Sequence, residues 1–179
     1  RPHNGSGDDA SARSDGRTDP DTGETVAGEL FPADPDGDDM EPALLVRVLG
    51  APGVPDRPNL GRRELILTVL LTCRRRPVAA SAAQDALWGG KPVEAKTVWN
   101  VIGATRKALG DLPDGTPVMP SADRARGTLR VALHVVTDLT LLHRLVEQAR
   151  QAPSSEAIGL LREGLDLVVG PPFDAAGYD

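Results

Sequence analysis

The stretch from Lys91 to Gly110 constrains the fold more than any other, because its apolar residues recur with the period of an α-helix. The residues expected on its buried side, at i, i+4, i+7 and i+11, are Val98, Ile102, Thr105 and Leu109. The residues left for the opposite side are Lys96, Asn100, Val101, Ala104 and Lys107. Gly110 is expected to end the helix, since glycine adopts the left-handed conformation without steric cost. What the outer side of this helix contacts is the main functional question.

Further elements are expected on both sides of this helix. A β-like run at Leu44–Leu49 comes before a helix at Gly61–Arg76, whose predicted buried stripe is Leu65, Val69, Leu70 and Cys73. A second, alanine-rich helix is expected at Pro77–Gly90. After Gly110 the sequence indicates a short strand at Val118–Met119, a polar hairpin tip at Ser121–Gly127 and a return strand at Thr128–Leu133.

Two amphipathic helices are predicted near the end of the sequence, at Thr137–Gln151 and Ser154–Val169. Ser154 or Ser155 is the expected N-cap of the second helix. A single helical pair leaves apolar faces uncovered, since repeat arrays need several units to bury them. We therefore expect this region to be the truncated start of a helical domain in a longer chain.

Charge is distributed unevenly along the chain. Residues 1–42 hold 3 Lys or Arg against 12 Asp or Glu, and almost no apolar side chains. Such a composition cannot offset the entropy of ordering, so this segment is expected to be a disordered acidic linker or tail. Residues 43–134 hold 14 basic against 7 acidic side chains, and residues 135–179 hold 3 against 7. A basic middle segment suits a nucleic-acid or acidic partner, although an arginine-favouring genome would produce the same bias.

Several classes of protein are disfavoured by the sequence. Cys73 is the only cysteine, which excludes an internal disulfide and fits a reducing, cytoplasmic compartment. It is interpreted as a small buried apolar residue because no basic partner is close in sequence. No signal peptide or membrane-spanning apolar run is visible. No catalytic triad, metal cluster or phosphate loop occurs, so neither an enzyme nor a cofactor or metal site is expected.

The order of strand, three helices and hairpin is that of a winged helix-turn-helix. The chain contains the segments RRELILTVLLTCRRRPV, QDALWGG, KTVWNVIGATRKALG and GTLRV, of which DALW (Asp85–Trp88) and RKALG (Arg106–Gly110) are the most characteristic. These segments resemble the OmpR-type winged-helix domain of actinobacterial SARP-family regulators. The later VTDL and REGLDLVVGPPF segments resemble the start of the bacterial transcriptional activator domain, a tetratricopeptide-like array that follows the winged helix in that family.

The resemblance implies an α+β fold with a winged helix-turn-helix at residues 43–133 and a helical domain beginning at residue 134. Its third helix would lie in the DNA major groove, with the wing against the backbone. The residues suited to contact double-stranded DNA are Lys96, Thr97, Asn100, Arg106, Lys107, Arg124 and Arg126. Asn100 is suited to adenine, whereas Lys107 and the wing arginines are suited to phosphates.

The sequence also departs from the family pattern. Family members typically carry an arginine at the position of Ala104, and Thr105 stands where a buried leucine is usual. Trp99 lies off the apolar stripe and is a candidate protein contact.

Two functions are therefore compatible with the sequence. One is a DNA-binding transcriptional regulator whose helical region self-associates or binds a protein. The other is a winged helix retained as a cytoplasmic protein-interaction or signalling module of a larger protein, tethered to a membrane through the acidic linker.

Overall fold

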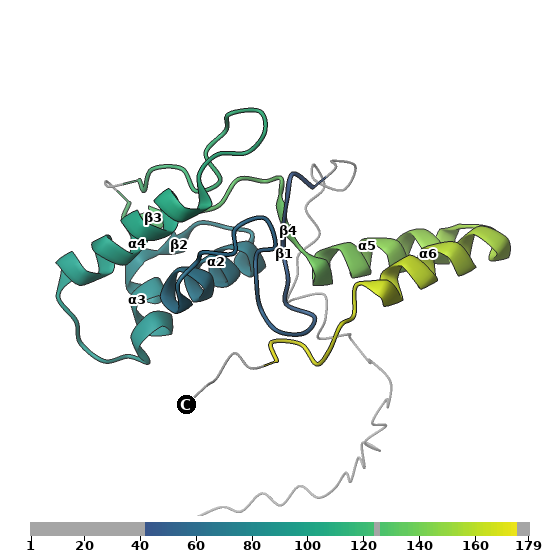
Figure 1. Cartoon of the computed structure of the whole chain (residues 1–179), viewed down its shortest axis with the longest axis horizontal. Coiled ribbons are helices and arrows are strands. Elements are labelled where there is room, and N and C mark those ends of the chain that lie inside the picture. Colours follow the sequence, from purple (N-terminus) through teal and green to yellow (C-terminus); the bar gives the residue numbers. More distant parts are fainter. Residues whose placement is uncertain (1–41, 124–125, 175–179) are drawn as a thin grey trace, which may run out of the picture.

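The computed structural model describes residues 42–123 and 126–174. The predicted acidic tail, apart from Pro42, lies outside the described residues, as do Arg124 and the last five residues. The elements follow the order β1 (Leu44–Val46), α2 (Arg62–Arg74), β2 (Val78–Ala79), α3 (Ala80–Trp88), α4 (Ala95–Leu109), β3 (Thr128–Leu129), β4 (Val135–Thr137), α5 (Asp138–Gln151) and α6 (Ser154–Asp166). The fold is mixed α+β, as the sequence predicts. Figure 1 shows α2, α3 and α4 gathered on one side, while α5 and α6 extend together from the other.

Helix α2 crosses the centre of the core, and its predicted buried stripe is wrong. The fully buried side consists of Leu67, Thr68, Leu71 and Thr72, whereas Leu65, Val69, Leu70 and Cys73 are only half-buried. The two threonines tolerate burial because each hydroxyl donates to a carbonyl one turn earlier, at 2.8 Å in both cases. A pattern that counts threonine as polar therefore misplaces the buried side of this helix.

Helix α4 buries the four predicted residues, Val98, Ile102, Thr105 and Leu109, which confirms the periodicity. The hydroxyl of Thr105 donates to the Val101 carbonyl at 2.8 Å, so the helix itself satisfies this buried polar group. The helix begins at Ala95, directly after Glu94, whose extended backbone (φ −63°, ψ 137°) places it at the N-cap position. Gly110 ends the helix, but with φ 64° and ψ −144°, outside the left-handed helical region that was expected. That backbone conformation is essentially restricted to glycine.

A small antiparallel pairing joins the segment after α2 to the segment after α4. Val78 lies opposite Leu129 and Ala79 opposite Thr128, so the helix predicted from Pro77 begins only at Ala80. The Ala80 amide donates to the Gly127 carbonyl at 2.8 Å, which continues the pairing. The return strand predicted at Thr128–Leu133 is limited to its first two residues. Val118–Met119, predicted as a strand, is fully buried but forms no regular strand.

A second pairing, which the sequence analysis does not predict, connects β1 to the helical pair. Strand β1 runs parallel to β4, and Thr137 at the end of β4 caps α5 by accepting from the Thr140 amide at 3.0 Å. The buried carboxylate of Asp138 accepts from the amides of Val48 at 2.8 Å and Leu49 at 3.0 Å. These contacts hold the start of α5 against the segment directly after β1.

The two last helices pack side by side (Figure 1). Gly164 of α6 lies so close to Leu142 of α5 that an added Cβ would meet the leucine Cδ1 at 2.9 Å. The predicted serine N-cap is wrong, since Pro153 occupies the cap position and accepts from the amides of Glu156 and Ala157. Within the described ranges, no helix combines the length and the apolar character needed to cross a membrane.

Candidate nucleic-acid interface

The outer side of α4 carries a polar strip opposite its buried side. Lys96, Asn100 and Lys107 are exposed and, at i, i+4 and i+11, fall on one line along the helix. At about 1.5 Å per residue, the two lysines lie roughly 16 Å apart along the axis. Gly103 lies between them and is also exposed, and α4 contains no Asp or Glu. We call Lys96, Asn100, Gly103 and Lys107 the outer strip.

Two predicted site residues lie on the flanks of this strip. Thr97 is exposed about 100° around the helix from Lys96, so it borders the outer strip without belonging to it. Arg106 is half-buried, and its Nη1 donates to the Ser121 hydroxyl at 2.9 Å. This bond ties the C-terminal end of α4 to the segment that leads into the hairpin. Arg106 therefore positions the two elements relative to each other.

Trp99 lies on the same side of α4 as Arg106, because the two residues are seven positions apart. Its exposed fraction is 41%, so this large apolar ring borders the outer strip on the hairpin side. The prediction that it lies off the buried stripe is confirmed. An exposed Trp in this position provides an apolar contact surface next to the two lysines.

The hairpin that follows α4 carries further positive charge. Asp123 and Thr128 exchange backbone hydrogen bonds, which closes the turn. Arg126, with a side-chain exposure of 83%, has its Nε 3.7 Å from the Asp123 carboxylate. Arg130 is also exposed, immediately after the buried Leu129, and the sequence analysis missed it. The alternation of buried and exposed residues along a strand would have found it.

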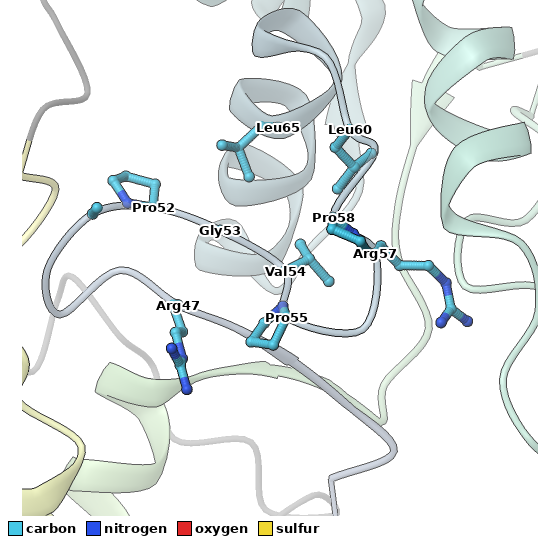
Figure 2. Close-up of a pocket in the computed structure, with 10 residues that line it drawn as sticks. Arg47, Pro52, Gly53, Val54, Pro55, Arg57, Pro58, Leu60 and Leu65 are labelled. Atoms are coloured by element: carbon cyan, nitrogen blue, oxygen red, sulfur yellow. The ribbon is translucent and has the colours of Figure 1, made fainter.

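The C-terminal end of α4 is anchored by Arg57, another residue that the sequence analysis missed. Its Nε donates to the Leu109 carbonyl at 2.7 Å, and its Nη2 donates to the Asp111 carbonyl at 3.1 Å. A guanidinium at this end both pairs free carbonyls and complements the helix dipole. The loop that presents Arg57 also lines an open hollow of about 300 Å³. Figure 2 shows the Arg57 guanidinium pointing away from that hollow.

Helix α3 is held against α2 at its end. The guanidinium of Arg63 lies over the ring of Trp88, 5.3 Å from its centroid, in a cation–π contact. Gly89 then adopts φ 60°, which ends α3 and directs the chain toward α4. The short connection that follows joins α3 to α4, and both of these helices pack against α2.

The titratable groups with shifted pKa values provide no catalytic constellation. Burial, together with the nearby Asp138 carboxylate, raises the pKa of the Cys73 thiol to about 11, which disfavours the nucleophilic thiolate. The pKa of Asp114 is lowered chiefly because its carboxylate accepts the Thr116 amide at 2.8 Å in an exposed turn. Among the described residues, no three or more His, Cys, Asp or Glu side chains gather as metal ligands would.

No protein-family model matches this chain, and the search of curated proteins found no match.

Proposed function

We propose that this chain is a winged helix-turn-helix protein that binds duplex DNA through α4 and regulates transcription. The observation that carries the proposal is the outer strip of α4, where two lysines and an asparagine are exposed on a helix without acidic residues. Helices α3 and α4 correspond to the helix-turn-helix, and the hairpin closed at Asp123–Thr128 corresponds to the wing. In this architecture the second helix of the motif enters the major groove.

The side chains divide into two roles on this proposal. Asn100, near the middle of the outer strip, is suited to pair with an adenine edge through its amide. Lys96 and Lys107 flank it along the helix and would contact phosphates of the groove walls. The exposed wing arginines, Arg126 and Arg130, would contact the neighbouring backbone. Arg106 holds the wing against α4 through Ser121 and is a positioning residue.

The outer strip also suggests that sequence discrimination is modest. Ala104 is exposed next to Asn100 and offers only a methyl group to a base edge. A single bidentate pair contributes about 1–3 kcal/mol of discrimination. Phosphate contacts therefore supply most of the binding free energy, which makes affinity strongly dependent on salt.

The test is a titration of labelled duplex DNA with the full chain, followed by fluorescence anisotropy at several salt concentrations. Four phosphate contacts, from Lys96, Lys107, Arg126 and Arg130, predict a log–log salt slope of about −3.6, at roughly −0.9 per contact. Lys107→Ala should make that slope less steep by about one contact and weaken binding to all sequences alike. Asn100→Ala should leave the slope unchanged and reduce the difference between preferred and mixed sequences.

A matched control is Arg150→Ala, which removes an exposed charge from α5, far along the chain from the outer strip. It should leave both affinity and salt slope unchanged. Equal losses in Lys107→Ala and Arg150→Ala would mean that binding follows overall charge. Two chains should be tested at about 20 mM salt, where the Debye length exceeds 20 Å: the unmodified chain and a variant in which the acidic residues of the run 34–41 are converted to amides. If neither chain binds DNA under these conditions, the proposal is contradicted.

The exposure of Trp99 supports a second candidate function, a winged helix that binds a protein partner in the cytoplasm. Large aromatic residues often dominate the binding free energy of protein interfaces. On this alternative, Trp99→Ala would remove partner binding while the melting temperature stays nearly unchanged, since the ring is partly outside the core. In either case the tetratricopeptide-like pair α5–α6 would supply self-association or a protein contact.

A further inference from the structure

We propose that the acidic segment before β1, centred on residues 34–41, docks on the basic surface of α4 and the wing, and that it competes there with DNA. The competition rests on the proposed function, whereas the docking itself does not require DNA. We call Lys96, Lys107, Arg126 and Arg130 the basic surface. The inference joins this surface of the described chain to the charge of the N-terminal sequence.

The basic surface holds four positive side chains, and the acidic side chains that flank it in the sequence are Glu94, Asp111 and Asp123. Helix α4 contributes Lys96 and Lys107 and contains no carboxylate. On the wing, Asp123 lies beside Arg126 and partly offsets its charge, through a contact of 3.7 Å in which both side chains are largely exposed. The segment 43–134 as a whole carries a net charge of +7, from 14 basic and 7 acidic side chains. A solvent-exposed surface of this kind attracts any flexible acidic chain held near it.

Residues 1–41 carry the opposite charge. They contain 12 Asp or Glu against 3 Arg, and five of the acidic residues fall within the eight residues of the run 34–41. These five are Asp34, Asp36, Asp38, Asp39 and Glu41. The run includes one apolar side chain besides its proline and glycine, Met40, so any contact it makes is mainly electrostatic. A series of closely spaced carboxylates offers the basic surface the same kind of charge as a DNA backbone.

Tethering makes such a weak contact effective. Exposed ion pairs contribute only about 0.2–1 kcal/mol each, so three or four of them would not hold two separate molecules together. A short tether, however, gives an effective concentration on the order of 1 mM. Reach sets a limit, since the run joins directly to Pro42 and its eight residues extend at most about 26 Å from it, at roughly 3.3 Å per residue. The contact should therefore form within one chain at low salt and dissolve as screening increases.

The experiment compares two variants of the full chain that change the net charge equally. The first converts the acidic run to amides: Asp34→Asn, Asp36→Asn, Asp38→Asn, Asp39→Asn and Glu41→Gln. The control converts five exposed acidic residues of α5, α6 and the following segment: Glu147→Gln, Glu156→Gln, Glu163→Gln, Asp166→Asn and Asp174→Asn. A 20-base-pair mixed-sequence duplex is the DNA probe. The first variant should bind about five- to tenfold more tightly than the control at 50 mM salt, and within twofold of it at 300 mM.

A second readout does not involve DNA. Zero-length carbodiimide coupling of the unmodified chain, followed by mass spectrometry, should join carboxylates of residues 34–41 to the amines of Lys96 and Lys107 at 50 mM salt. The yield should fall at 300 mM salt and should not change on tenfold dilution, because the contact is intramolecular. Lys91, exposed before α4, serves as the reference amine outside the basic surface.

The outcomes separate the inference from the proposed function. Coupling to Lys96 and Lys107 with no DNA binding by either variant would overturn the proposed function and the competition while supporting the docking. Equal DNA affinity of the two variants would overturn the competition. Coupling no stronger than at Lys91 would overturn the docking, and coupling that falls on dilution would show that the acidic segment binds a second copy.

Discussion

Cys73 shows how one residue reports on its surroundings. Its thiol lies half-buried on α2, facing a region that includes the buried carboxylate of Asp138. Both burial and the negative charge disfavour the thiolate, and together they raise the pKa of the thiol from 9.0 to about 11. The interpretation of Cys73 as an inert apolar residue therefore gains a physical basis.

The raised pKa of Cys73 predicts slow alkylation and a dependence of stability on pH. At pH 8 the native thiolate fraction should be about 100-fold below that of the unfolded chain, so iodoacetamide should react correspondingly slowly until denaturant is added. The pKa of the Cys73 thiol is higher in the folded state than in the unfolded state. The contribution of the neutral thiol to the stability of the folded state is therefore complete below pH 9 and is lost as pH rises through 11. By pH 10 it should have fallen by about 1 kcal/mol relative to Cys73→Ala, measured by urea unfolding. An equal pH dependence in Cys73→Ala would show that other groups are responsible.

Threonine marks the limit of what single residues reveal from sequence. The sequence predicts that Thr105 is buried in α4, which the structure confirms, but it does not predict the burial of Thr68 and Thr72 in α2. All three donate their hydroxyls to a carbonyl of their own helix, so burial leaves no hydroxyl proton unpaired. In α4 three apolar residues define the stripe unambiguously, while α2 is apolar on several sides and its inner side depends on packing against α3 and α4.

At the scale of elements, α4 contains a residue that weakens it without serving its packing. Gly103 is exposed in the middle of the helix, and a Cβ added there would meet nothing within 4 Å. Glycine in a helix interior is roughly 0.8–1 kcal/mol less favourable than alanine. Since the glycine lies in the outer strip, on the side proposed to bind DNA, it would leave room for the close approach of a base edge or backbone.

Gly103→Ala should stabilise the protein by about 0.8 kcal/mol against urea unfolding, because the helix gains propensity without a steric cost. Gly159→Ala in α6 is a matched case, also exposed and with nothing within 4 Å, and should give a similar gain. Gly164→Ala should give much less, because its Cβ would meet Leu142 Cδ1 at 2.9 Å. If Gly103→Ala also weakens DNA binding while Gly159→Ala does not, the methyl group obstructs the interface and the outer strip is in contact with DNA.

Helices were predictable from sequence and the strands largely were not. Helix periodicity is local, and α2, α4 and α5 were found within a few residues of their ends. The strands β2 and β3 contain two residues each, and their register depends on a partner about fifty residues away. Arg57 was missed for the same reason, since it caps α4 across 52 residues of sequence. The outer strip could be predicted because it follows from one helix alone.

At the scale of the whole molecule, the segment directly after β1 joins the two groups of helices. The Val48 and Leu49 amides donate to Asp138 at the start of α5, while their carbonyls accept from the Phe173 amide at 2.7 Å and the Val169 amide at 3.1 Å, beyond α6. The helical pair is thus attached at both of its ends to the same two residues. Figure 1 shows α5 and α6 extending away from the α2–α4 region, and we expect these hydrogen bonds to hold the pair in that position.

Asp138→Asn should test that attachment. The carboxylate also accepts from its neighbour's amide, Leu139, at 2.9 Å, so three backbone donors converge on it. An amide presents two N–H groups in place of one acceptor oxygen, which leaves at least one buried donor without a partner at a cost of about 1–3 kcal/mol. We expect a loss of about 2 kcal/mol in unfolding free energy and faster hydrogen exchange at the Val48 and Leu49 amides.

The control is Glu147→Gln, an equivalent change at an exposed carboxylate of α5, which should alter the unfolding free energy by less than about 0.5 kcal/mol. If the two variants are equally stable, or if exchange accelerates uniformly, the connection at Asp138 does not hold the helical pair in place, and α5–α6 would move independently of α4.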